Sequence, residues 1–121
     1  MHYSPKSIRS FIGAKDYQES RAFYSELGFE EVVIDKTMSL IKVNENLAFY
    51  LQNAYVKDWI DNSMLFLEVD DLEAFEHELL DKQLPEKYKK VRISKIKNWD
   101  WGREIFMHDP SGVLWHFGEF F

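Results

Sequence analysis

The sequence predicts an α+β fold made of two tandem β-α-β-β-β units. Three observations lead to this prediction. Short segments in which apolar and polar residues alternate are typical of strands. Two longer segments have apolar residues at helical spacing, and each follows a strand and begins near an acidic residue that can cap a helix. The order of one strand, one helix and three strands occurs twice along the 121 residues, so we expect one repeated unit within a single domain.

The first unit is expected over residues 7–52. A short strand at residues 9–13 precedes Asp16, which predicts a capping box with Glu19. The helix that starts here carries an apolar stripe and ends at Gly28. The stripe is expected to lie in the core and consists of Tyr17, Phe23, Tyr24 and Leu27. The remaining segments are three strands and a linker to the second unit, at residues 30–35, 38–43, 47–52 and 53–62 respectively.

The second unit is expected over residues 63–121 and repeats this order. A strand at residues 64–69 precedes a capping pair, Asp70 with Glu73, and a helix that ends before Pro85. The strands predicted after this helix lie at residues 91–96, 103–108 and 113–117. The last two are joined by the sequence Asp-Pro-Ser-Gly, which has the residue types that tight turns require. These two strands therefore form a hairpin.

Side chains on this final hairpin divide between two faces, since neighbouring residues in a strand point in opposite directions. One face is apolar and is expected to be core, with Ile105, Met107, Val113, Trp115 and Phe117. The other face mixes polar and aromatic side chains, with Glu104, Phe106, His108, Leu114, His116 and Gly118. Such a mixture is typical of a ligand-binding surface.

Composition excludes several classes of function. A net charge of −6 opposes binding to nucleic acid, which needs a positive field. No apolar run approaches the ~20 residues that span a bilayer and no signal peptide is recognisable, so we expect a cytoplasmic protein without a membrane partner. The absence of cysteine excludes disulfides and thiolate metal sites. Lysine and arginine gather in residues 82–97, where they fit either a solvated edge strand or attraction of an anionic ligand.

Two short sequence motifs connect this sequence with a known family. Residues 22–29 read Ala-Phe-Tyr-Ser-Glu-Leu-Gly-Phe, and residues 109–112 read Asp-Pro-Ser-Gly. Together with the two units, they resemble the glyoxalase, bleomycin-resistance and dioxygenase superfamily, also called vicinal oxygen chelate. Residues 101–104, Trp-Gly-Arg-Glu, look most like its bleomycin-resistance branch. The resemblance implies curved mixed sheets around a ligand-binding cleft, and a homodimer.

The resemblance also implies where a divalent metal would bind in an enzyme of this superfamily. The ligand positions correspond to Arg9, Met64 and His116, and only His116 is a good ligand for such an ion. We therefore expect no cofactor and favour binding over catalysis. The alternative is a divalent metal held by a second set of residues, namely Glu68, Glu104, His108 and His116.

The predicted cleft face combines aromatic rings, a thioether and a few charged groups, a mixture that suits a planar small molecule with or without a cationic group. The candidate ligand-binding residues are Arg9, Phe11, Tyr50, Met64, Phe66, Glu68, Trp99, Trp101, Glu104, Phe106, His108 and His116. Two of them have structural alternatives: Glu104 could pair with Arg9 instead of a ligand, and Trp101 could pack at a subunit interface.

The function predicted from the sequence is metal-independent sequestration of a small molecule, such as a bleomycin-type antibiotic, which would confer resistance. Two alternatives stay open. One is a metal-dependent enzyme of the glyoxalase or dioxygenase type, in which Glu104 would move a proton. The other is a protein that binds an ordinary metabolite, because proteins that share a fold share the architecture of a pocket more often than the identity of its ligand.

Overall fold

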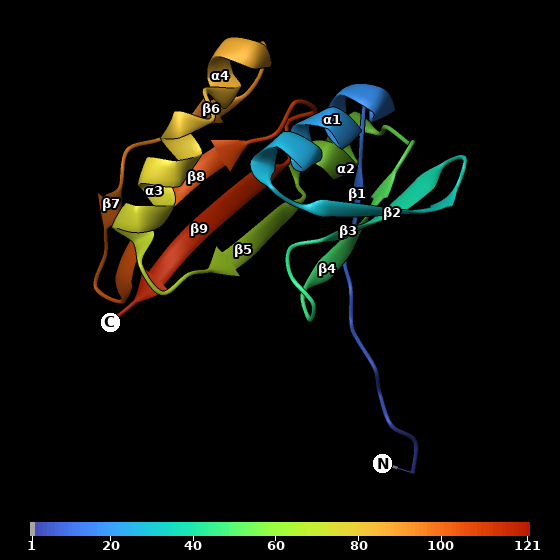
Figure 1. The fold of residues 1–121 in the computed structure, drawn as a ribbon, viewed down its shortest axis with the longest axis horizontal. Helices are drawn as coiled ribbons and strands as arrows, with labels where there is room; N and C mark the ends of the chain where they lie inside the picture. Colours follow the sequence, from blue (N-terminus) through green and yellow to red (C-terminus); the bar gives the residue numbers. More distant parts are fainter. Residues whose placement is uncertain (1) are drawn as a thin grey trace.

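The computed structural model describes residues 2–121, and its first half forms a four-stranded sheet with one covering helix (Figure 1). The strands are β1 (Phe11–Gly13), β2 (Glu30–Asp35), β3 (Met38–Lys42) and β4 (Ala48–Gln52), in the sheet order β1-β4-β3-β2. Helix α1 (Tyr17–Leu27) begins after Asp16, whose carboxylate accepts the backbone N–H of Glu19 at 3.1 Å. It ends at Gly28, which adopts a φ of 108°. Both ends of this helix were correctly predicted.

The second half forms the other sheet. Its strands are β5 (Met64–Glu68), β6 (Arg92–Ile93), β7 (Lys97–Asn98), β8 (Gly102–His108) and β9 (Leu114–Phe120). They follow the order β5-β9-β8-β6, and β7 also pairs with β8. Two helices, α3 (Leu72–Asp81) and α4 (Leu84–Lys87), come between β5 and β6. A further short helix, α2 (Lys57–Asp61), lies where the sequence predicted only a linker.

The two sheets repeat one topology. The first strand of each half runs parallel to the last, β1 beside β4 and β5 beside β9, and the remaining pairs are antiparallel. Both sheets are therefore mixed, which confirms the predicted α+β fold class. No helix within residues 2–121 is long and apolar enough to cross a membrane.

Two local predictions for the second half were wrong. The cap of α3 is Asp71, whose carboxylate accepts the N–H of Ala74 at 3.1 Å, and not Asp70. The strand predicted at residues 91–96 is reduced to β6 at residues 92–93, and β7 follows separately at residues 97–98. The cause is Ser94, whose hydroxyl replaces its carbonyl as the acceptor for the N–H of Phe106 at 2.9 Å. A side-chain acceptor within a ladder interrupts the regular backbone pairing.

The helix-covered faces of both sheets meet in one core. Trp115 of β9 lies 5.9 Å from Tyr24 of α1 and 5.3 Å from Phe49 of β4 between ring centroids, so rings of both halves pack together. The Tyr24 hydroxyl also accepts the indole N–H of Trp115 at 2.9 Å and donates to the carboxylate of Asp109 at 2.7 Å. Tyr24 and Asp109 are completely buried. This polar network joins the two halves inside the core.

Candidate functional site

The opposite face of each sheet, which we call the open face, keeps large side chains exposed. On the first sheet, Phe11 and Tyr50 are register partners and their rings stack at 4.8 Å. The guanidinium of Arg9 donates to the Tyr50 hydroxyl at 3.0 Å and lies 5.6 Å from the centre of that ring. Three predicted site residues are therefore brought together, and they form a cationic and aromatic group.

The open face of the second sheet carries an exposed cluster of three rings, Phe66, Trp101 and Phe120, which we call the aromatic patch. Its ring centroids lie 5.0 to 5.8 Å apart. Phe66 sits directly on Gly118, where a Cβ would collide with the ring. Phe120 was missed by the sequence analysis, because the last strand was predicted to end at Phe117 and in fact continues to Phe120. The signal that could have extended the predicted strand is its alternation, since Phe120 follows His116 and Gly118 at the same two-residue spacing.

Beside the patch, Glu104 and His116 form a pair in which the imidazole Nδ1 lies 2.8 Å from the carboxylate. The other ring nitrogen, Nε2, lies 3.3 Å from the sulfur of Met64. Phe106 meets the imidazole edge-on at 5.0 Å. Glu104 is buried and pairs with His116, so the suggested ion pair with Arg9 is not formed.

Two other predicted site residues lie away from this cluster. His108 stands at the far end of β8, opposite Arg92, beside a hollow of about 440 Å³. Burial, together with the nearby charge of Arg92, lowers the pKa of His108 and favours the neutral ring. Trp99 lies in the turn before β8 and makes no ring contact with the patch among the described residues.

The residues present do not fit the divalent metal that the superfamily resemblance implies. No three His, Asp or Glu side chains of residues 2–121 come close enough to hold one ion. At the family ligand positions, Arg9 brings a permanent positive charge and Met64 already contacts His116. His116 itself is held by Glu104. The alternative set also fails to assemble, because Glu104 and His108 lie four residues apart along the extended strand β8.

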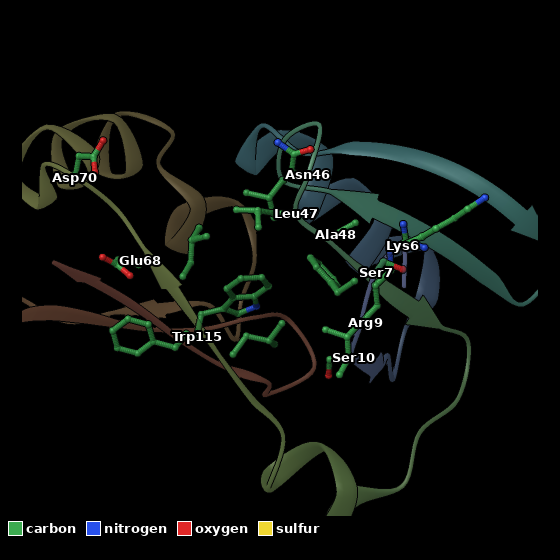
Figure 2. A pocket seen from close by; sticks show the side chains of 16 residues that line it. Lys6, Ser7, Arg9, Ser10, Asn46, Leu47, Ala48, Glu68, Asp70 and Trp115 are labelled. Atoms are coloured by element: carbon green, nitrogen blue, oxygen red, sulfur yellow. The ribbon is translucent and has the colours of Figure 1, made fainter. Parts of the chain in front are cut away.

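A groove of about 680 Å³ lies between the two halves, and we call it the seam groove. Figure 2 shows its lining, which comes from the segment before β1, the start of β4, and β5 with the residues that follow it. Only three predicted ligand-binding residues line it: Arg9, Phe66 and Glu68. The single cleft expected from the sequence is thus divided within one chain into two open faces and this groove. Residues such as Lys6 and Asp70 were missed because the groove depends on how the halves pack.

Comparisons with known proteins agree with this fold. No family model and no curated protein matches the sequence. A bleomycin-binding protein from Streptomyces verticillus, solved with copper(II)-bleomycin, matches with a TM-score of 0.77 and 20% identity over 97% of each chain. An antibiotic-binding protein from Streptomyces sp. CB03234 matches with a TM-score of 0.75 and 17% identity, over 99% of this chain and 100% of that chain. A lactoylglutathione lyase from Agrobacterium tumefaciens matches with a TM-score of 0.68 and 18% identity, over 97% of this chain and 96% of that chain.

These similarities confirm the predicted resemblance at the level of the fold. The chain has the fold of the glyoxalase, bleomycin-resistance and dioxygenase superfamily, and bleomycin-binding and bleomycin-resistance proteins are prominent among the matching structures. Because the identities are low, the ligand has to be argued from the side chains of this chain.

Proposed function

We propose that this protein binds a planar, cationic small molecule on the aromatic patch and acts by sequestering it, without a metal. The observation that carries this proposal is an exposed three-ring cluster next to carboxylates. Glu68, whose carboxylate is exposed, is the register partner of Gly118, directly beside the row of Phe66, whereas Glu104 in the same row is held by His116. Aromatic faces and carboxylates both attract a flat cation, whereas neither favours an anion.

The known activities of proteins with this fold support the proposal. Two matching structures are described as a bleomycin-binding protein and an antibiotic-binding protein. Sequestration needs complementary contacts and no reacting group, which suits a site where Glu104 and His116 already satisfy each other. A bleomycin-type antibiotic is therefore our preferred ligand class.

We further propose that the protein is a homodimer in which the open faces turn toward the partner and the ligand site lies at or near the subunit interface. Phe11 and Phe66 are each nearly half exposed, and Met64 is 62% exposed. Such apolar surface is costly in water and is typical of an interface or a ligand site. Sedimentation equilibrium measures the oligomeric state directly, and a monomer at micromolar concentration contradicts this part of the proposal.

Proflavine, a flat tricyclic cation, provides a direct test when compared with acridone, its uncharged counterpart. We expect calorimetry to show tighter binding of proflavine, and Trp101→Ala to weaken that binding about fivefold to tenfold. Trp99→Ala is the matched control, since it removes the same side chain outside the patch. Equal binding of both probes, or equal effects of the two substitutions, contradicts the proposed site.

The antibiotic itself is tested separately. Expression of the protein in a bleomycin-sensitive bacterium is expected to raise the inhibitory concentration of bleomycin, and Trp101→Ala is expected to reduce this protection. If proflavine binds but bleomycin neither binds nor loses potency, the ligand is another planar cation and the resistance role is wrong.

A further inference from the structure

The seam groove has features that the aromatic patch does not need. Its volume of about 680 Å³ lies within the range of small-molecule sites, which run from about 300 to 1,000 Å³. Its middle is apolar, formed by Leu65 and Leu67 on β5 and the nearly buried ring of Trp115, with Leu47 just before β4 at its edge. Leu47 stays 47% exposed at the rim. This middle section suits a flat or apolar body.

The two ends of the groove carry opposite charges. Lys6 and Arg9 come from the segment before β1, whereas Glu68 and Asp70 come from β5 and the residues that follow it. Figure 2 shows the two cations on one side of the groove and the two carboxylates on the other, with Leu47 between them. A ligand lying along the groove therefore meets a positive region at one end and a negative region at the other.

These charges have no internal partner. Within residues 2–121, none of the four side chains forms an ion pair, although seven other pairs are formed elsewhere. The one hydrogen bond made by the Arg9 guanidinium goes to the uncharged phenol of Tyr50. The cations and carboxylates remain separated across the groove and free to meet charged groups of a ligand.

We propose that the seam groove binds an amphoteric small molecule. Its cationic group would lie at Glu68 and Asp70, its flat apolar body over Leu47 and the β5 leucines, and its anionic group at Lys6 and Arg9. This inference goes beyond the proposed function, because a simple planar cation would gain nothing at Lys6 and Arg9. Glu68 adjoins both sites, so the deciding residues are Lys6, Arg9 and Asp70.

The experiment uses a naphthalene probe that carries both charges, 5-(2-aminoethylamino)naphthalene-1-sulfonate, and two analogues that each lack one charge. The first analogue is N-acetylated and keeps only the sulfonate. The second lacks the sulfonate and keeps only the amine. Probe fluorescence measures binding to the intact protein, and we expect the amphoteric probe to bind about fivefold or more tightly than either analogue.

Substitutions test which end of the groove binds the sulfonate of the probe and which end binds its amine. Lys6→Gln and Arg9→Gln are each expected to weaken the two sulfonate-bearing probes about fivefold and to leave the amine-only probe unchanged. Asp70→Asn is expected to do the reverse. Lys36→Gln and Asp58→Asn make the same charge changes at exposed positions outside the groove and serve as matched controls.

The possible outcomes distinguish a small-molecule ligand in the groove from a second copy of the chain. If all three probes bind equally, or if the groove variants behave like their controls, the proposal is wrong. If Lys6→Gln and Asp70→Asn change the dimer dissociation constant in sedimentation but not probe binding, the groove is a contact between two copies of the chain and the proposal is also wrong. Proflavine binding that is lost in Trp101→Ala and kept in Asp70→Asn reports on the aromatic patch and not on the groove, so the two proposals can fail independently.

Discussion

Removal of one buried hydroxyl, by Tyr24→Phe, is expected to loosen the connection between the two halves of the molecule. The Tyr24 hydroxyl donates to Asp109 at 2.7 Å and accepts from the indole of Trp115 at 2.9 Å. The other carboxylate oxygen of Asp109 is already occupied by the N–H groups of Ser111, Gly112 and Val113. Because the site is closed to water, the groups that lose the hydroxyl have no replacement partner.

The expected loss follows from these two partners. An unsatisfied buried polar group costs about 1–3 kcal/mol, and a group that carries charge costs more. One orphaned carboxylate oxygen and one orphaned indole N–H therefore give a loss of about 3–5 kcal/mol in the free energy of unfolding. Such a loss is a large fraction of the roughly 5–15 kcal/mol that keeps a domain folded.

Urea unfolding followed by circular dichroism measures this loss. We expect a lower midpoint for Tyr24→Phe with the slope unchanged, since the surface exposed on unfolding stays the same. Tyr55→Phe is the control, because Tyr55 is exposed and its substitution should change stability by less than about 0.5 kcal/mol. A loss below about 1 kcal/mol for Tyr24→Phe would show that the network does not hold the halves together.

The same tyrosine predicts that the folded state loses stability at alkaline pH. Burial, with the nearby charge of Asp109, raises the pKa of Tyr24 well above its usual range. The folded state thus keeps the phenol proton, so this contribution to stability is complete below the ordinary pKa of about 10 and is lost as pH rises toward the folded pKa. Above pH 10, the stability of Tyr24→Phe should fall less steeply than wild type, by about 1.4 kcal/mol per pH unit.

Three further predictions concern other parts of the fold. The Arg21 guanidinium, 2.6 Å from Glu31, lowers the pKa of that carboxyl, so its contribution is present above its ordinary pKa of about 4.3 and lost as pH falls through the folded pKa. In the Glu31→Gln variant, the urea midpoint of unfolding should therefore fall less steeply as the pH is lowered into the acid range. A fall as steep as that of the wild type contradicts this. Gly118→Ala should displace the Phe66 ring, lower stability by about 1–3 kcal/mol and weaken proflavine binding, which unfolding and calorimetry test together. Ser94→Ala should cost about 1 kcal/mol and speed hydrogen exchange at the β8 amide that the serine hydroxyl accepts, and normal protection there would refute this role.

Strand periodicity was sufficient to predict which residues share a face. Phe66 and His116 were assigned to one surface from alternation alone, and they are register partners on the open face of the second sheet. The repeated order of elements was readable because each helix follows a strand and begins beside an acidic residue, although the cap of the second helix was assigned to Asp70 and is Asp71. Local patterns suffice for these features because they depend on neighbours within a few residues.

The remaining features depend on contacts between distant segments. The pairing of Glu104 with His116 needs particular rotamers, which alternation does not specify. The seam groove needs the angle at which the two halves pack, so no residue spacing indicates that Lys6 and Asp70 line one cavity. The division of the strand at Ser94 depends on one side-chain hydrogen bond across the sheet. These are tertiary effects that override local preference.

The open faces of the two halves carry opposite charges beside the same aromatic arrangement. In each half, the first strand places a phenylalanine beside a polar ring of the last strand, Phe11 with Tyr50 and Phe66 with His116. The polar ring then binds a charged group: Tyr50 takes the guanidinium of Arg9. His116 takes the carboxylate of Glu104 instead.

The two units thus share an aromatic arrangement and differ in the charge beside it. Two identical halves would present the same charge twice and favour a ligand with equivalent ends. Two groove ends of opposite charge favour a ligand whose ends differ, because each end is attracted to one side and repelled by the other. We infer that this difference in charge, more than the shape of either sheet, selects and orients a ligand in the seam groove. Charge reversal at Arg9 alone, by Arg9→Glu, should then shift the preference from amphoteric toward purely cationic probes.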